Sequence, residues 1–168
     1  ELIALSLSNT GTTRKDAKFD IDGGIFTLAH YGRLGAELGG RRSLLDGDGI
    51  QLGRTARYWG QHVLTPLTGA AVQINAFNFP CWGMLEKIAP TLLAGMPTIV
   101  KPASQTCYLT EAMVRAIIES KILPDGALQL ICGGVGDLLA HVDCQDVVTL
   151  TGSATTGPGW KSTSIPMP

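Results

Sequence analysis

Two polar residues stand where apolar segments of the chain end, and their chemistry gives the first indication of a site. Asn78 comes shortly after the apolar segment 70–74, and Lys101 directly after the apolar segment 98–100. An amide N–H held in place can stabilise a developing oxyanion. An ammonium group at the end of a buried strand needs an oxygen partner, such as a phosphate or a ribose hydroxyl. The alternatives are an asparagine that bonds only its own turn and a solvated lysine.

The stretch between these residues predicts a β-α-β unit that would bring them together. Apolar residues recur at three- and four-residue spacing over 80–94, which is typical of a helix, and Gly95 stands where a helix stops. Ligands of open parallel sheets bind at the carboxyl ends of the strands. Asn78 and Lys101 both fall at such ends. The periodic residues are Trp82, Leu85, Ile88, Ala89, Leu92 and Leu93.

The second half of the chain alternates between strand-like and helix-like segments. Such alternation predicts an α/β fold with a Rossmann-like parallel sheet and flanking helices. Thr106 is expected to cap the second of these helices, and residues 124–126 to form the turn after it. We expect strands near 70–75, 97–101, 127–132 and 146–150, and helices near 80–94, 107–121 and 136–142.

The first half is less regular. Residues 1–15 have the pattern of a helix end followed by a turn. Residues 16–38 have the amphipathic pattern of a helix, weakened by the pair Gly23-Gly24. Residues 41–53 are rich in glycine and aspartate and predict a surface loop, whereas 55–65 favour a strand.

Composition excludes several classes of protein. With 168 residues, 45% of them hydrophobic and 16% charged, the chain can bury the core of one globular domain. The formal net charge is −1 and the basic residues are scattered, so we expect no nucleic-acid partner and no anionic membrane surface. All apolar runs are short, and no signal peptide is evident. These features predict a cytoplasmic protein.

Cysteines and histidines do not form a metal site in the sequence. No CxxC pair is present, and no histidine lies at zinc-like spacing from a cysteine. We expect free thiols buried in regular segments, and disulfides in a secreted protein are the alternative. The residues concerned are Cys81, Cys107, Cys132, Cys144, His30, His62 and His141.

Several ordered motifs resemble one protein family. NAFNFP at 75–80, followed by a helix and then IVKPASQT at 99–106, is similar to the cofactor domain of aldehyde dehydrogenases. DIDGGIFTLAHYGRLG, ICGG and DVVTLTGSATTG most resemble one branch of this family, the aldehyde dehydrogenase half of PaaZ-type proteins of aerobic, CoA-linked phenylacetate degradation. The resemblance runs from about Asn9 to Gly157.

The resemblance implies a division of the chain. Residues 1–69 would form a helical and ribbon region, partly used for oligomerisation, since members of the family are homo-oligomers. Residues 70–157 would form part of a NAD(P)-binding Rossmann-like domain. Residues 158–168, which carry three prolines, do not match the family pattern and predict a disordered tail.

The resemblance also implies roles for three residues. Asn78 matches the asparagine that stabilises the oxyanion, and Lys101 matches the lysine that contacts the adenosine ribose. Ser104 stands where many NAD-preferring relatives have a glutamate. A carboxylate there would repel a ribose 2′-phosphate, whereas a hydroxyl leaves room for it. The expected cofactor is therefore NADP, with NAD possible, although Ser104 as an indifferent loop residue is the alternative.

Further cofactor contacts follow from the same resemblance. Gly133 matches a glycine near the adenine pocket, and Gly152 and Ser153 match the pair that meets the pyrophosphate. The glycine cluster itself lacks the GxGxxG spacing and is weak evidence alone. The remaining implied contacts are Ile74, Asn75, Ala76 and Phe77.

Residues for covalent chemistry are not evident in the sequence. The nucleophilic cysteine and the glutamate base of the family have no matching positions, and Cys81 has no base or cation beside it in the sequence. The leading hypothesis is a fragment of an NAD(P)-dependent aldehyde dehydrogenase, acting on an aldehyde such as a CoA-linked semialdehyde and inactive alone. The alternatives are a truncated module that binds only nucleotide or a partner protein, and an unrelated nucleotide-binding α/β module.

Overall fold

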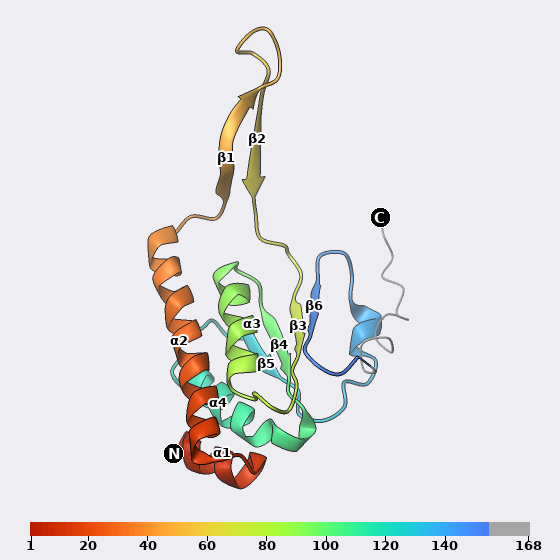
Figure 1. The fold of residues 1–168 in the computed structure, drawn as a ribbon. Helices are drawn as coiled ribbons and strands as arrows, with labels where there is room; N and C mark the ends of the chain where they lie inside the picture. Colours follow the sequence, from red (N-terminus) through yellow and green to blue (C-terminus); the bar gives the residue numbers. More distant parts are fainter. Residues whose placement is uncertain (155–168) are drawn as a thin grey trace.

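A four-stranded parallel sheet forms the centre of the computed structural model, which describes residues 1–154. The strands are β3 (Ala71–Ile74), β4 (Thr98–Lys101), β5 (Leu128–Leu130) and β6 (Val147–Leu150). Their order in the sheet is β5-β4-β3-β6, and all neighbours are parallel (Figure 1). The predicted α/β fold with a Rossmann-like parallel sheet is confirmed, because each expected strand falls within two residues of an observed one.

Helices α3 (Trp82–Leu93) and α4 (Cys107–Glu119) connect the strands as expected. Gly95 adopts φ +83 directly after the α3 C-cap, which is the left-handed conformation that ends many helices. The core lies where these helices meet the sheet. Its buried members include Met84, Leu85, Ile88, Val100, Leu109, Val114 and Leu128.

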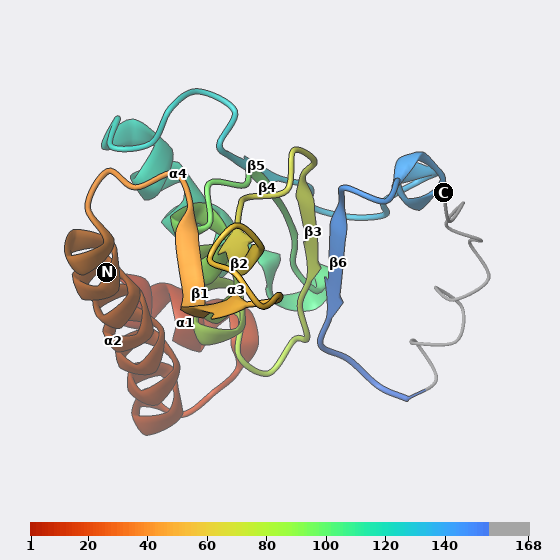
Figure 2. The same cartoon turned by 90° about the horizontal axis from the view of Figure 1, so that it is seen from above.

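Helices α1 (Leu2–Thr10) and α2 (Arg14–Leu38) complete the packed part of the chain. α2 packs along α3, and Figure 2 shows both on the same side of the sheet. The Gly23-Gly24 pair does not interrupt α2. A Cβ on Gly24 would lie 3.0 Å from Leu85 Cδ1 and 3.1 Å from Trp82 Cα, so this glycine permits close approach of the two helices.

A β-hairpin projects from the body of the molecule (Figure 1). It consists of β1 (Leu44–Gln51) and β2 (Trp59–Leu64), paired antiparallel with an irregular register between Asp46 and Ile50. The expected loop at 41–53 is therefore wrong, and the expected strand at 55–65 is shorter than predicted. Both strands are largely exposed, so they lack the alternation of apolar and polar residues that a half-buried strand shows.

Other expectations are corrected in detail. The expected helix at 136–142 is a short 3-10 helix, η2 (Leu138–His141), and Ser104 lies in another, η1 (Ser104–Thr106). Thr106 stands at the N-cap position of α4, but its hydroxyl bonds the Phe77 carbonyl instead of the helix. Cys132 and Cys144 are exposed, so the expectation of four buried thiols is wrong, although all four cysteines are free.

Within residues 1–154, no helix is long and apolar enough to cross a membrane. The division of the chain at residue 69 stays a prediction. The expected tail at 158–168 lies outside the described residues.

Candidate cofactor and oxyanion site

Three neighbouring strands end in register, so their carboxyl ends lie side by side. Ile74 at the end of β3 pairs with Lys101 on β4 and with Leu150 on β6. The ladder continues one step beyond the strands, because Asn75 N–H donates to the Lys101 carbonyl at 3.0 Å and Thr151 N–H donates to the Ile74 carbonyl at 2.9 Å. The backbone at the site is therefore fixed on both sides of β3.

A cleft of about 590 Å³ opens at these exits. It collects every sequence-predicted site residue except Gly133, including segments that are 79 residues apart in the chain, from Ile74 to Ser153. Gly133 has φ +107, a conformation that favours glycine, but it does not line the cleft. The lining residues from the prediction are Ile74, Asn75, Ala76, Phe77, Asn78, Lys101, Ser104, Gly152 and Ser153.

The charge and polarity of this cleft fit a dinucleotide phosphate. Lys101 is half-buried and its ammonium group donates to the Pro102 carbonyl at 3.1 Å. No carboxylate stands among the described residues that line the cleft. Asn75 is 4% exposed, and neither its amide nitrogen nor its amide oxygen has a partner within the described part of the chain. Because buried polar groups without partners cost free energy, such a side chain is suited to a polar ligand.

The turn that carries Asn78 is held from α4. The Thr106 hydroxyl donates to the Phe77 carbonyl at 3.1 Å, and the buried Thr110 hydroxyl donates to the Pro80 carbonyl at 3.0 Å. The Asn78 side chain itself is exposed and makes no hydrogen bond with the residues described. Its backbone is thus positioned while its amide stays available for a ligand.

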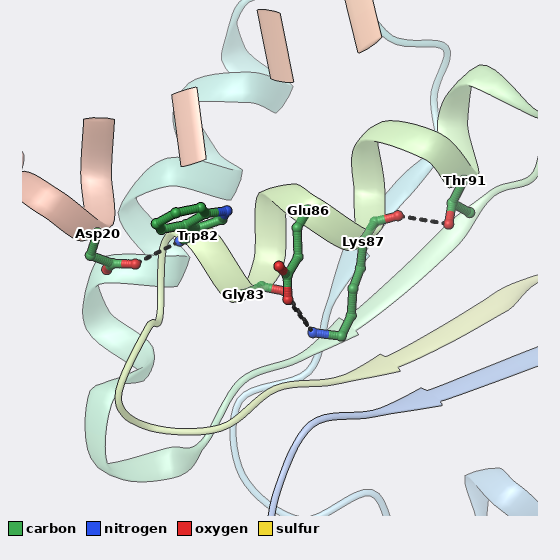
Figure 3. A network of polar contacts seen from close by, with 6 residues as sticks. All are labelled: Asp20, Trp82, Gly83, Glu86, Lys87 and Thr91. Carbon is green, nitrogen blue, oxygen red and sulfur yellow. Dashed lines mark hydrogen bonds and ion pairs between the residues drawn. The ribbon is translucent and has the colours of Figure 1, made fainter. Parts of the chain in front are cut away.

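The same turn is held from α2 by a buried carboxylate. Asp20 accepts from the backbone N–H groups of Cys81 at 3.1 Å and Trp82 at 2.7 Å, at the start of α3. Figure 3 shows the bond from Trp82. Asp20 is 4% exposed, and burial raises its pKa above the usual value, although the two N–H groups act in the opposite direction. Asp20 therefore caps α3 from a different helix.

Several polar contacts run along α3, and one of them ties this helix to the sheet. The Lys87 ammonium group donates to the Gly83 carbonyl at 2.9 Å and lies 3.4 Å from the Glu86 carboxylate (Figure 3). The Thr91 hydroxyl donates to the Lys87 carbonyl and accepts from Gln73 Nε2 on β3, both at 2.8 Å. The helix that begins beside Asn78 is thereby tied to the strand that ends beside it.

A second pocket, of about 360 Å³, is also lined by Asn78. Its walls include an edge-to-face cluster in which the ring centroids of Phe19 and Trp82 are 5.4 Å apart and those of Phe79 and Trp82 are 6.1 Å apart. Ala76, Asn78 and Thr151 line this pocket and the cleft alike. Apolar walls around a few polar groups are typical of a small-molecule site.

Sequence reasoning missed this aromatic pocket. Phe19 lies on α2, about sixty positions before its partners, and no spacing in the sequence connects it with them. Trp82 was expected only as part of a helix face, yet it is partly exposed. Its ring packs so close to Gly23 that a Cβ on this glycine would overlap Trp82 Cε3. Only a family comparison at the level of residue pairs could have indicated this contact.

Cys81 is a structural thiol, as predicted. It is fully buried, and its Sγ lies 3.9 Å from the Ile21 carbonyl. Burial and the neighbouring Asp20 carboxylate raise the pKa of the thiol to about 12, so a nucleophilic thiolate is strongly disfavoured. Within residues 1–154, no group of three or more His, Cys, Asp or Glu side chains is placed to hold a metal ion.

Comparison with known proteins gives the family. The family model described as "Aldehyde dehydrogenase family" matches residues 1–162. The chain is 53% identical over 156 residues to the 3,4-dehydroadipyl-CoA semialdehyde dehydrogenase of Aromatoleum evansii, covering 93% of this chain and 30% of that enzyme. It is 29% identical over 160 residues to the D-glyceraldehyde dehydrogenase (NADP(+)) of Thermoplasma acidophilum, covering 94% of this chain and 30% of that enzyme. The chain thus spans about a third of the length of these relatives.

Solved structures agree with the sequence comparisons. A betaine aldehyde dehydrogenase variant from Staphylococcus aureus, in complex with NAD+, superposes with a TM-score of 0.77 at 25% identity, over 97% of this chain and 31% of that one. The NADP-dependent glyceraldehyde-3-phosphate dehydrogenase of Bacillus halodurans, complexed with NADP, shares the fold with a TM-score of 0.77 at 24% identity, over 98% of this chain and 35% of that one. The chain belongs to the aldehyde dehydrogenase family.

Proposed function

We propose that this chain forms the cofactor-binding and oxyanion-stabilising part of an NADP-dependent aldehyde dehydrogenase, and that it does not turn over alone. One observation carries the proposal. Asn78 lines two pockets, a cleft that contains Lys101 and an aromatic pocket that contains Phe79 and Trp82. Such a residue can contact a group in either pocket.

The residues of the cleft support binding of NADP. The Lys101 ammonium group would pair with the ribose or phosphate oxygens, and the backbone at Gly152 would lie against the phosphates without a side chain in the way. Ser104 lines the cleft and is exposed, so it presents a hydroxyl where a glutamate would repel a 2′-phosphate. When bound, NADP would accept the hydride that leaves the aldehyde carbon.

The two pockets support the role of Asn78. The amide N–H of Asn78 would donate to the oxygen of the substrate as negative charge develops on it. The hydrogen bonds from Thr106 and Thr110 fix the turn, so the donor would be positioned in advance of the reaction. The nucleophilic cysteine and the base that the family uses would come from residues that have no match here.

The substrate class follows from the relative with 53% identity. Its name describes a semialdehyde linked to CoA, and we propose the same class of substrate for the protein that contains this chain. The apolar walls of Phe19, Phe79 and Trp82 would contact the hydrocarbon part next to the aldehyde.

A chimera tests this proposal. This chain would replace the matching residues of the Aromatoleum evansii enzyme, and formation of NADPH from an aldehyde would be followed with and without Asn78→Ala. We expect kcat to fall by about 10² to 10³ in the variant, with the Kd of NADP changed little. An active chimera whose kcat is unchanged by Asn78→Ala would refute the role of Asn78. Turnover by the chain alone would refute the claim that it lacks the nucleophile.

A further inference from the structure

One charged side chain lies among the apolar walls of the aromatic pocket. Glu86 is on α3, four positions after Trp82, so the two side chains lie on the same face of the helix. Among the described residues that line this pocket, Glu86 is the only one with a charge, and its side chain is 47% exposed. Asn78, the proposed oxyanion donor, lines the same pocket. A carboxylate therefore shares this pocket with the position proposed for the aldehyde group.

The cation that pairs with Glu86 does not line the pocket. The Lys87 ammonium group lies 3.4 Å from the Glu86 carboxylate and donates to the Gly83 carbonyl at 2.9 Å (Figure 3). The Lys87 side chain is only 11% exposed. A molecule in the pocket is thus next to the carboxylate and not next to the ammonium group. Apolar walls strengthen the effect of this charge, because the effective dielectric constant beside them is below that of water.

The proposed substrate and its free acid differ in charge at the end opposite the aldehyde. A free semialdehyde carries a carboxylate there at neutral pH, whereas the thioester of a CoA-linked semialdehyde is neutral. The Glu86 carboxylate would repel the first and not the second. Repulsion of the wrong ligand is one of the two ways in which a site becomes specific.

We propose that Glu86 is a specificity-determining residue, which excludes aldehydes that carry a free carboxylate and admits neutral ones such as thioesters and esters. This inference rests on the proposed function, since it takes the aromatic pocket as the site for the hydrocarbon part of the substrate. Lys87 and dissolved salt reduce the repulsion in part. The discrimination due to Glu86 should therefore be about fivefold to twentyfold.

The alternative is that Glu86 only forms an ion pair at the surface. Exposed ion pairs contribute little to stability, so Glu86→Gln, which keeps the shape of the side chain, should leave the fold intact. Glu111→Gln is the matched control. The Glu111 carboxylate lies 3.3 Å from the Arg115 guanidinium group on α4, its side chain is 43% exposed, and it does not line the pocket.

The experiment titrates the chain with two aldehydes that differ only at the far end, methyl 6-oxohexanoate and 6-oxohexanoate. Trp82 lines the pocket, so its fluorescence reports binding there. Trp59→Phe and Trp160→Phe remove the signal of the other two tryptophans. In this background the Kd of each aldehyde is measured with Glu86, with Glu86→Gln and with Glu111→Gln, at low and at high salt. The same aldehydes are then used as substrates of the chimera described above, and kcat/KM is measured.

We expect the ester to bind more tightly than the acid. Glu86→Gln should reduce the ratio of the two Kd values by about fivefold or more, through tighter binding of the acid. Glu111→Gln should leave the ratio unchanged, and high salt should reduce the ratio only where Glu86 is present. The proposal is overturned if Glu86→Gln leaves the ratio unchanged, or if neither aldehyde alters the fluorescence of Trp82.

The chimera separates this inference from the proposed function. A kcat/KM ratio that depends on Glu86, in a chimera whose kcat is unchanged by Asn78→Ala, would refute the role of Asn78 and support that of Glu86. The opposite pair of results would refute the role of Glu86 alone. If the chimera is inactive, the titration of the chain decides, because it requires binding and no turnover.

Discussion

Replacing Asp20 by alanine should destabilise the whole chain, because this carboxylate joins α2 to the start of α3. The change leaves the N–H groups of Cys81 and Trp82 without their acceptor in a buried place. Loss of an N-cap costs about 0.5 to 2 kcal/mol, and each buried donor left without a partner costs about 1 to 3 kcal/mol. Relief of the desolvated carboxylate offsets part of this cost. We expect the free energy of unfolding to fall by about 2 to 3 kcal/mol.

Asp20→Asn removes the negative charge but keeps one acceptor oxygen for the hydrogen bonds. Its amide oxygen still accepts from the helix start, so we expect about half the loss seen with alanine. The pKa of Asp20 is raised in the folded chain, which means that the folded state holds the proton more tightly than the unfolded state does. The contribution of this proton to the free energy of unfolding is fully present below pH 3.8, the usual pKa of an aspartate. It is lost as the pH rises through the pKa that Asp20 has in the folded chain.

Urea denaturation at acidic and neutral pH measures both effects. The stability of the wild type relative to Asp20→Asn should be greatest at acidic pH and should decrease as the pH rises. The reasoning is refuted if Asp20→Ala unfolds at the same urea concentration as the wild type. It is also refuted if the wild type gains stability over Asp20→Asn as the pH rises, since that would mean a lowered pKa.

Two further predictions concern contacts between elements. Gly24→Ala places a methyl group against Leu85 and Trp82, so overpacking of about 1 to 3 kcal/mol should exceed the gain of about 1 kcal/mol in helix propensity. Gly32→Ala, in the same helix with nothing within 4 Å of the new Cβ, should instead be stabilising, and urea denaturation of both variants checks the opposite signs. The Asp146 carboxylate accepts from the N–H groups of Ala70 at 2.7 Å and Asp143 at 2.9 Å, and the bond from Ala70 is the main cause of its lowered pKa. Asp146→Asn should therefore lower the free energy of unfolding above pH 3.8, the usual pKa of an aspartate. This loss should vanish as the pH falls through the pKa of Asp146 in the folded chain, and a loss that persists in acid would contradict the reasoning.

The β-α-β alternation was predictable from the sequence, because its strands and helices are buried on defined faces. Trp82 to Leu93 repeats its apolar residues with the helical period, and the strands at 71–74 and 98–101 are short segments rich in buried β-branched residues. The arrangement of Asn78 and Lys101 at one edge followed from the same pattern, since parallel strands present their carboxyl ends together.

What the sequence did not predict depends on contacts between distant segments. The hairpin was missed at 44–51 because its strands are exposed on both faces and carry no periodicity. The cap that Asp20 provides to α3 joins residues from separate elements. Thr106 had the right residue type and position for a helix cap, but the nearby Phe77 carbonyl takes its hydroxyl.

Calorimetric titration of the chain with NADP and with NAD tests the central claim most directly. We predict saturable binding of NADP, weaker binding of NAD, and a Kd for NADP that rises by about tenfold or more in Lys101→Ala, because a charge-assisted bond contributes about 1.5 to 3 kcal/mol. Ser104→Glu should reverse the preference toward NAD, since its carboxylate would repel the 2′-phosphate. The account is contradicted if the chain unfolds cooperatively but binds neither dinucleotide, or if Lys101→Ala binds NADP as tightly as the wild type does.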